Sequence, residues 1–144
     1  SMKNKIFTIV AAFFIAFTLS CSSDDDGPSI SEASRDLRGT WELFQIIENN
    51  TPVASIPCNQ QREFTYNQDF SYSEIDYAGQ DPDNCEVAAT FNGTWENIED
   101  DMVLTLRRTG AETTESFTIS FRNNAQFFDV NQSSERTLTY QKIN

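Results

Sequence analysis

The side chains that could do chemistry in this chain are its three cysteines and its many carboxylates, because it contains no histidine. Without histidine the chain cannot build a Ser-His-Asp or Cys-His catalytic centre, or the usual zinc sites. The cysteines stand at positions 21, 58 and 85. A cysteine can serve as a nucleophile, a metal ligand or a disulfide partner, and the sequence around each one indicates which role applies.

Carboxylates crowd together in the segment 81–86, which reads DPDNCE. A calcium loop needs a glycine at its sharp turn and a terminal glutamate at fixed spacing, and this segment has neither, so we interpret it as a solvated turn. Paired carboxylates can also hydrolyse glycosides. With 22 acidic residues in a small chain, however, pairs arise by chance. We therefore expect no catalytic residue, no metal, no cofactor and no enzyme activity.

The segment before Cys21 is typical of an export signal. Lys3 and Lys5 provide a basic start, and residues 6–19 form a charge-free apolar stretch of 14 residues. A membrane-spanning helix needs roughly 20 residues. We therefore expect residues 1–20 to be a cleaved signal peptide rather than a permanent anchor.

The junction Thr18-Leu19-Ser20-Cys21 resembles the lipobox of bacterial lipoproteins, although its leucine stands one position closer to the cysteine than in the commonest pattern. That resemblance implies a lipid-modified Cys21 that anchors the protein to a membrane. The run SSDDDGP at 22–28 resembles the acidic signal of Bacteroidetes lipoproteins exported to the cell surface, which implies an outer-membrane lipoprotein facing outward. The alternatives are an ordinary secretory signal before a chance cysteine, and a merely solvated spacer. We take residues 21–36 as the lipidated cysteine and a flexible acidic linker.

The remaining cysteines, Cys58 and Cys85, form an even pair in a chain that we expect to leave the cytoplasm, so a disulfide is the default. A free nucleophilic thiol is the alternative.

Removal of Lys3 and Lys5 with the signal leaves 8 basic against 22 acidic residues. Such a negative surface repels phosphate backbones, so we expect no nucleic-acid partner.

From Leu37 onward the apolar residues recur with period two, which predicts half-buried strands. The predicted strands are 40–48, 62–66, 69–77, 86–97, 102–108, 114–122, 125–131 and 136–142. The alternation slips in the third strand, so we predict a bulge near Ser73 or Glu74. In the fourth strand the alternation places Val87 on the same face as Phe91. Short polar turns join these strands into an antiparallel meander, which either closes into an up-and-down barrel or forms a two-layer sandwich. We favour the eight-stranded barrel, within an all-β domain.

Leu37-Arg38-Gly39-Thr40-Trp41 resembles the first-strand Gly-x-Trp signature of the lipocalin-like domains of bacterial lipoproteins, members of the calycin group. Residues 93–96 repeat its Gly-Thr-Trp-Glu, and the similarity covers residues 37–144. The resemblance implies that Gly39 permits a close backbone approach and that Trp41 plugs the closed end of the barrel. It also implies a basic residue covering that tryptophan, for which Arg136 is the matching position; simple solvent exposure of Arg136 is the alternative.

Two functions follow from such a barrel, which is just wide enough to be filled by side chains or to hold one small ligand. In the first, the protein binds a small apolar or amphipathic molecule at the barrel mouth, for which the candidate residues are Tyr66, Tyr72, Tyr77, Phe91 and Trp95. In the second, aromatic side chains fill the barrel, and the protein is a structural, adhesive or complex-forming surface module acting through its loops. The sequence names no protein partner for either function.

Overall fold

A computed structural model describes residues 31–98 and 103–144 of the 144-residue chain. The predicted signal peptide, the lipidation site at Cys21, the acidic run at 22–28 and the predicted turn at 99–101 lie outside the described residues. None of the helices within the described ranges is long and apolar enough to cross a membrane.

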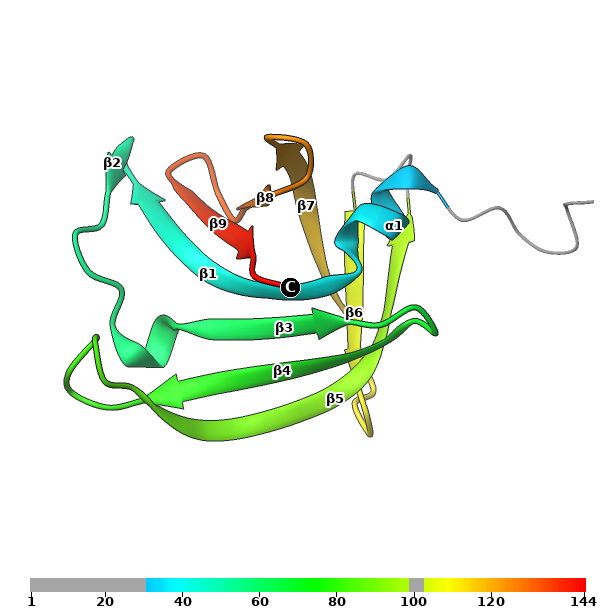
Figure 1. Cartoon of the computed structure of the whole chain (residues 1–144), viewed down its shortest axis with the longest axis horizontal. Coiled ribbons are helices and arrows are strands. Elements are labelled where there is room, and N and C mark those ends of the chain that lie inside the picture. The colour runs from blue at the N-terminus through cyan, green and yellow to red at the C-terminus, as the bar shows by residue number, and fades with distance from the viewer. Residues whose placement is uncertain (1–30, 99–102) are drawn as a thin grey trace, which may run out of the picture.

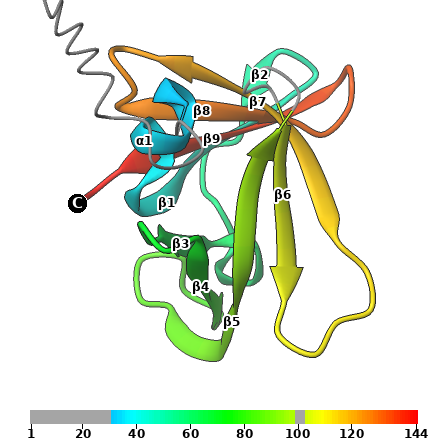
Figure 2. The same cartoon turned by 90° about the vertical axis from the view of Figure 1, so that its right-hand side faces the viewer.

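The described residues form a closed antiparallel barrel (Figure 1). A short helix leads into strands that pair in sequence order, and pairing of the first long strand with the last closes the cylinder. Figure 2 shows the strands curving round a common interior, with β3 and β4 on one side and β6 and β7 on the other. The elements are α1 (Glu32–Leu37), β1 (Gly39–Glu48), β2 (Thr51–Pro52), the 3-10 helix η1 (Cys58–Gln60), β3 (Arg62–Tyr66), β4 (Ser71–Ala78), β5 (Glu86–Ile98), β6 (Val103–Arg108), β7 (Glu115–Arg122), β8 (Phe127–Asn131) and β9 (Arg136–Lys142).

The eight-stranded antiparallel barrel predicted from period-two alternation is therefore confirmed. The short strand β2 is an addition that pairs only with the end of β1. Residues 32–36, which the sequence placed in the linker, belong to α1 instead. Ser31 caps this helix by accepting a hydrogen bond from the backbone nitrogen of Ser34 at 3.0 Å, and Leu37 at its end is fully buried.

The phase of β4 corrects the sequence prediction. Tyr72, Glu74 and Asp76 share the inner face, so no bulge interrupts the strand at Ser73 or Glu74. The register shift lies instead opposite the end of β4, where one extra residue of β5 separates the partners of Asp76 and Tyr77. The shift turns Val87 outward, away from the face that carries Phe91, and its side chain is 61% exposed.

Aromatic rings fill much of the barrel interior. Trp41 packs edge-on against Phe128 with ring centroids 4.7 Å apart, and Phe128 stacks on Tyr140 at 5.0 Å. Trp95 packs against Tyr66 at 5.6 Å and against Phe70 at 5.0 Å. Because such rings each bury roughly 150–250 Å², a few of them occupy most of a small barrel. What remains open is therefore a small space near one end.

Candidate functional site

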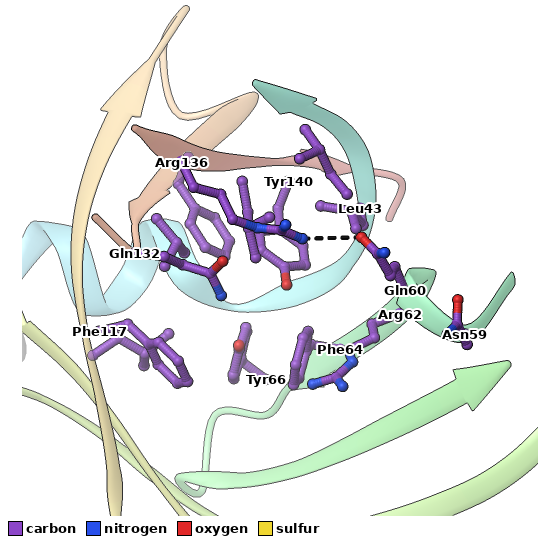
Figure 3. A pocket seen from close by; sticks show the side chains of 15 residues that line it. Leu43, Asn59, Gln60, Arg62, Phe64, Tyr66, Phe117, Gln132, Arg136 and Tyr140 are labelled. Atoms are coloured by element: carbon purple, nitrogen blue, oxygen red, sulfur yellow. Dashed lines mark hydrogen bonds between the residues drawn. The ribbon is translucent and has the colours of Figure 1, made fainter. Parts of the chain in front are cut away.

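A cavity of about 150 Å³ lies among strand ends and loops at one end of the barrel, here called the mouth (Figure 3). Its apolar wall comes mainly from β1, β6, β7, β8 and β9, and aromatic rings from β3 and β9 form another part of the lining. Polar side chains from η1, β3 and the β8–β9 region complete it. The lining residues are Leu43, Ile46, Asn59, Gln60, Arg62, Phe64, Tyr66, Leu104, Phe117, Phe128, Val130, Gln132, Arg136, Leu138 and Tyr140.

Arg136 extends across the cavity in Figure 3. Its Nη2 donates a hydrogen bond to Gln60 Oε1 at 2.9 Å, and its Nη1 donates to the carboxylate of Glu48. Gln60 is placed by η1, and the next residue, Gln61, donates from Nε2 to the carbonyl oxygens of Ile56 and Pro82, each at 2.9 Å. The orientation of Arg136 therefore depends on the loop that carries η1.

A charged cluster stands behind the β3 wall of the cavity. Glu74 is almost completely buried, and its Oε2 accepts hydrogen bonds from Arg108 Nε at 3.0 Å and Nη2 at 2.8 Å. Arg62 Nη1 lies 3.6 Å from Glu74 Oε1, and Arg62 Nε lies 3.7 Å from Asp76 Oδ1. Desolvation raises the pKa of the Glu74 carboxyl, although its hydrogen bonds from Arg108 oppose that shift.

Tyr140 brings a hydroxyl group to the middle of the cavity (Figure 3). Burial raises its pKa well above the usual value for tyrosine. The hydroxyl therefore stays protonated and can donate a hydrogen bond to a molecule in the cavity.

The structure brings only part of the predicted ligand set to this cavity. Tyr66 lines it, whereas Tyr72 is buried beside Phe64 and Tyr66 without reaching the lining. Phe91 lies under the guanidinium of Arg108, 3.8 Å from Cζ to the ring centroid.

The other two members of the predicted set also lie away from the cavity. Trp95 is buried, and its Nε1 donates to the carbonyl oxygen of Asn67 at 3.1 Å. Tyr77 lies on the outer face of β4, where its hydroxyl donates to Glu63 Oε2 at 3.5 Å. Tyr77 therefore cannot act as a polar handle inside the barrel.

Sequence reasoning overlooked the polar lining, in particular Gln60, Arg62 and Gln132. A signal for Arg62 was present, because positions 62, 64 and 66 share one face of β3 and the aromatic residues Phe64 and Tyr66 already marked that face as internal. Gln60 and Gln132 lie outside the strands, in η1 and in the β8–β9 connection. Strand alternation therefore could not assign them a direction.

The Gly-Thr-Trp segment at the start of β1 makes the predicted close backbone approach at Gly39, but the basic residue over its tryptophan is not the predicted one. Gly39 has a φ of +122°, and a Cβ atom there would stand 2.3 Å from the carbonyl oxygen of Asn144, so glycine is required. Trp41 is fully buried. The basic group over its ring is Lys142, whose Nζ is 5.2 Å from the ring centroid. Arg136 does not stack there, because the β1–β9 register sets Lys142 opposite Trp41 and Arg136 opposite Glu48.

The predicted disulfide between Cys58 and Cys85 is present, with the two Cα atoms 5.5 Å apart. It fastens η1, which carries Gln60, to the start of β5. In the adjacent loop, Asp81 Oδ1 accepts a hydrogen bond from the backbone nitrogen of Asp83 at 3.1 Å, as in an ordinary Asx turn. The disulfide thus fixes the loop on one side of the mouth.

A search of curated proteins found no match to this chain. A family model described as a lipocalin-like domain matches residues 37–140, which run from the end of α1 through β8 and most of β9. The match begins at the buried Leu37 and includes Gly39 and Trp41. The chain therefore belongs to the family of lipocalin-like domains.

Proposed function

We propose that this chain is a surface-tethered binding protein that holds a small apolar or amphipathic ligand in the cavity at the barrel mouth. Lipocalin-like barrels commonly bind small hydrophobic molecules, and the family is generally non-enzymatic. The observation that carries the proposal is the cavity itself, which combines an apolar wall with converging polar groups. We propose that the chain has no catalytic role.

The volume of the cavity limits the size of the ligand. An engineered apolar cavity of about 150 Å³ can hold benzene, whereas typical drug-sized pockets measure roughly 300–1,000 Å³. The cavity here, at about 150 Å³, belongs to the smaller class. We therefore expect a ligand that inserts a group of about one ring, with any longer part remaining at the mouth.

Native mass spectrometry of the chain purified gently from its host tests this function. We expect a small molecule that stays bound in the gas phase and is lost on denaturation. Leu138→Phe, which adds an aromatic ring to the cavity wall, should abolish retention. Val87→Phe is the matched control, because it adds a ring at a position that is 61% exposed. An empty protein that is also not stabilised by a panel of apolar compounds would overturn the proposal.

We also propose that Cys21 carries the lipid anchor and that the domain faces outward from the outer membrane. The apolar leader, the lipobox-like junction and the acidic run support this placement. Protease treatment of intact cells tests it. Release of the domain from intact cells is expected, and release only after lysis would exclude a surface location.

One observation favours the alternative of a surface contact module. Phe44 is 52% exposed on the outside of β1, and its ring centroid is 5.5 Å from that of Phe127 on β8. The nearby apolar side chains of Ile46, Val53 and Ile56 do not add to this surface, because Ile46 is fully buried and Val53 and Ile56 pack against the core. The test is Phe44→Ser: impaired assembly or adhesion on cells, with ligand retention unchanged, would favour the contact module.

A further inference from the structure

The charges around the cavity contrast with the composition of the whole chain. Acidic residues outnumber basic ones by 22 to 10, giving a formal net charge of −12. Among the described residues that line the cavity, however, the charged side chains are Arg62 and Arg136, and no carboxylate is present. The acidic partners of these arginines, Glu48, Glu74 and Asp76, lie outside the lining.

The two guanidinium groups retain hydrogen-bonding capacity. Each guanidinium carries five N–H donors. Arg136 uses donors on Gln60 and Glu48. Arg62 meets Glu74 and Asp76 only at 3.6 and 3.7 Å, beyond normal hydrogen-bond length, and its side chain is 42% exposed. The carboxylates thus form ion pairs with Arg62 at distances longer than a hydrogen bond.

Glu74 competes only weakly with an incoming anion for the N–H groups of Arg62. The strong partner of Glu74 is Arg108, whose Nε and Nη2 both donate to Oε2. Arg108 does not line the cavity and lies over the ring of Phe91. An anion that enters from the mouth therefore meets Arg62 with its own N–H groups available.

The remaining surroundings define the rest of the ligand. Figure 3 shows Arg136 and Arg62 on two sides of the cavity, with the hydroxyl of Tyr140 and the amide of Gln132 directed into it. The apolar wall includes Leu104, Phe117 and Leu138. The cavity is too small for the chain of a long fatty acid, but it matches the size of a single benzene ring.

We propose that the ligand is a small organic anion, a monocarboxylate whose apolar part is about the size of one benzene ring. Its carboxylate sits between Arg62 and Arg136, and its apolar part lies against the wall formed by β6, β7 and β9. A planar guanidinium suits this role because it can donate two parallel hydrogen bonds to one carboxylate. This inference rests on the proposed function and names the chemical class of its ligand.

Calorimetric titration of the full chain in lipid nanodiscs tests this chemistry, with empty nanodiscs as the control for partitioning. The probes are benzoate and phenylacetate, their neutral amides, and dodecanoate. We expect each carboxylate to bind at least tenfold more tightly than its amide. In Arg62→Gln and Arg136→Gln the preference should fall to threefold or less, while binding of the amides persists and shows that the cavity is still formed. Arg107→Gln is the matched control, because Arg107 lies exposed on the outer face of β6.

The possible outcomes separate this inference from the proposed function. Equal affinity for carboxylates and amides would overturn the anionic ligand and leave a neutral apolar ligand in place. Tighter binding of dodecanoate than of benzoate and phenylacetate would overturn the one-ring size. Loss of charge preference in Arg107→Gln as well would overturn the assignment to Arg62 and Arg136. No binding of any probe, together with an empty protein from the host, would overturn the proposed function and this inference with it.

Discussion

Reduction of the disulfide between Cys58 and Cys85 should remove a large share of the stability of the domain. The two cysteines are 27 residues apart in the sequence. For a loop of this length, the lost entropy of the unfolded chain corresponds to about 3.5 kcal/mol. Small domains have a total free energy of unfolding of about 5–15 kcal/mol. The reduced protein should therefore stay folded but with a much smaller margin.

Urea unfolding of the full chain, with and without a reducing agent, measures this contribution. With a denaturant slope of about 2 kcal/mol per molar, the midpoint should fall by roughly 2 M on reduction. A Cys21→Ala background prevents mispairing with the third cysteine. The double variant Cys58→Ala, Cys85→Ala should show no response to the reducing agent. A loss below about 1 kcal/mol in the reduced protein would refute the loop-entropy reasoning.

Three further changes test particular contacts. Lys142→Met should lower the free energy of unfolding by about 1 kcal/mol through loss of the cation over Trp41, as measured in urea. Gly93→Ala should cost about 3 kcal/mol or more in thermal unfolding, because its Cβ would lie 2.0 Å from the carbonyl oxygen of Arg107. Desolvation raises the pKa of Glu74 in the folded chain, so this group adds stability as the pH falls through the raised pKa and adds none at neutral pH. Glu74→Gln should abolish this gain when the free energy of unfolding is measured as a function of pH. The same pH dependence in wild type and variant would contradict the assignment of the gain to Glu74.

The strands were predictable because one face of each is apolar and the other polar. Arg62–Tyr66 and Arg136–Lys142 have the bounds that the sequence predicted, since turn residues or loops limit them on both sides. The number of long strands and their short connections then favoured closure of the meander into a barrel. The cysteine pair was predictable for a different reason, because export makes a disulfide the default for an even number of thiols.

The interior of the barrel was less predictable because a polarity pattern assumes that charged residues face water. Glu74 and Asp76 face inward, where Arg62 on the adjacent strand β3 and Arg108 on β6, two strands away, provide opposite charges. Such cross-strand partners depend on register, which one sequence does not specify. The same limit explains the correction at Trp41. The sequence prediction named Arg136 as the basic residue over its ring, and the observed register sets Lys142 there instead.

Ionic strength should affect the approach of an anionic ligand more than its contacts inside the cavity. The net charge of −12 repels an approaching anion, whereas Arg62 and Arg136 attract it once it reaches the mouth. The Debye length shortens from about 30 Å at 0.01 M salt to about 10 Å at 0.1 M. Added salt therefore screens the distant carboxylates more than the contacts inside the cavity. The association rate of benzoate, followed by stopped-flow tryptophan fluorescence, should rise between these salt concentrations, while the dissociation rate changes little. A falling association rate would mean that the arginines dominate the field even at long range, and the repulsive surface would then have no part in selecting the ligand.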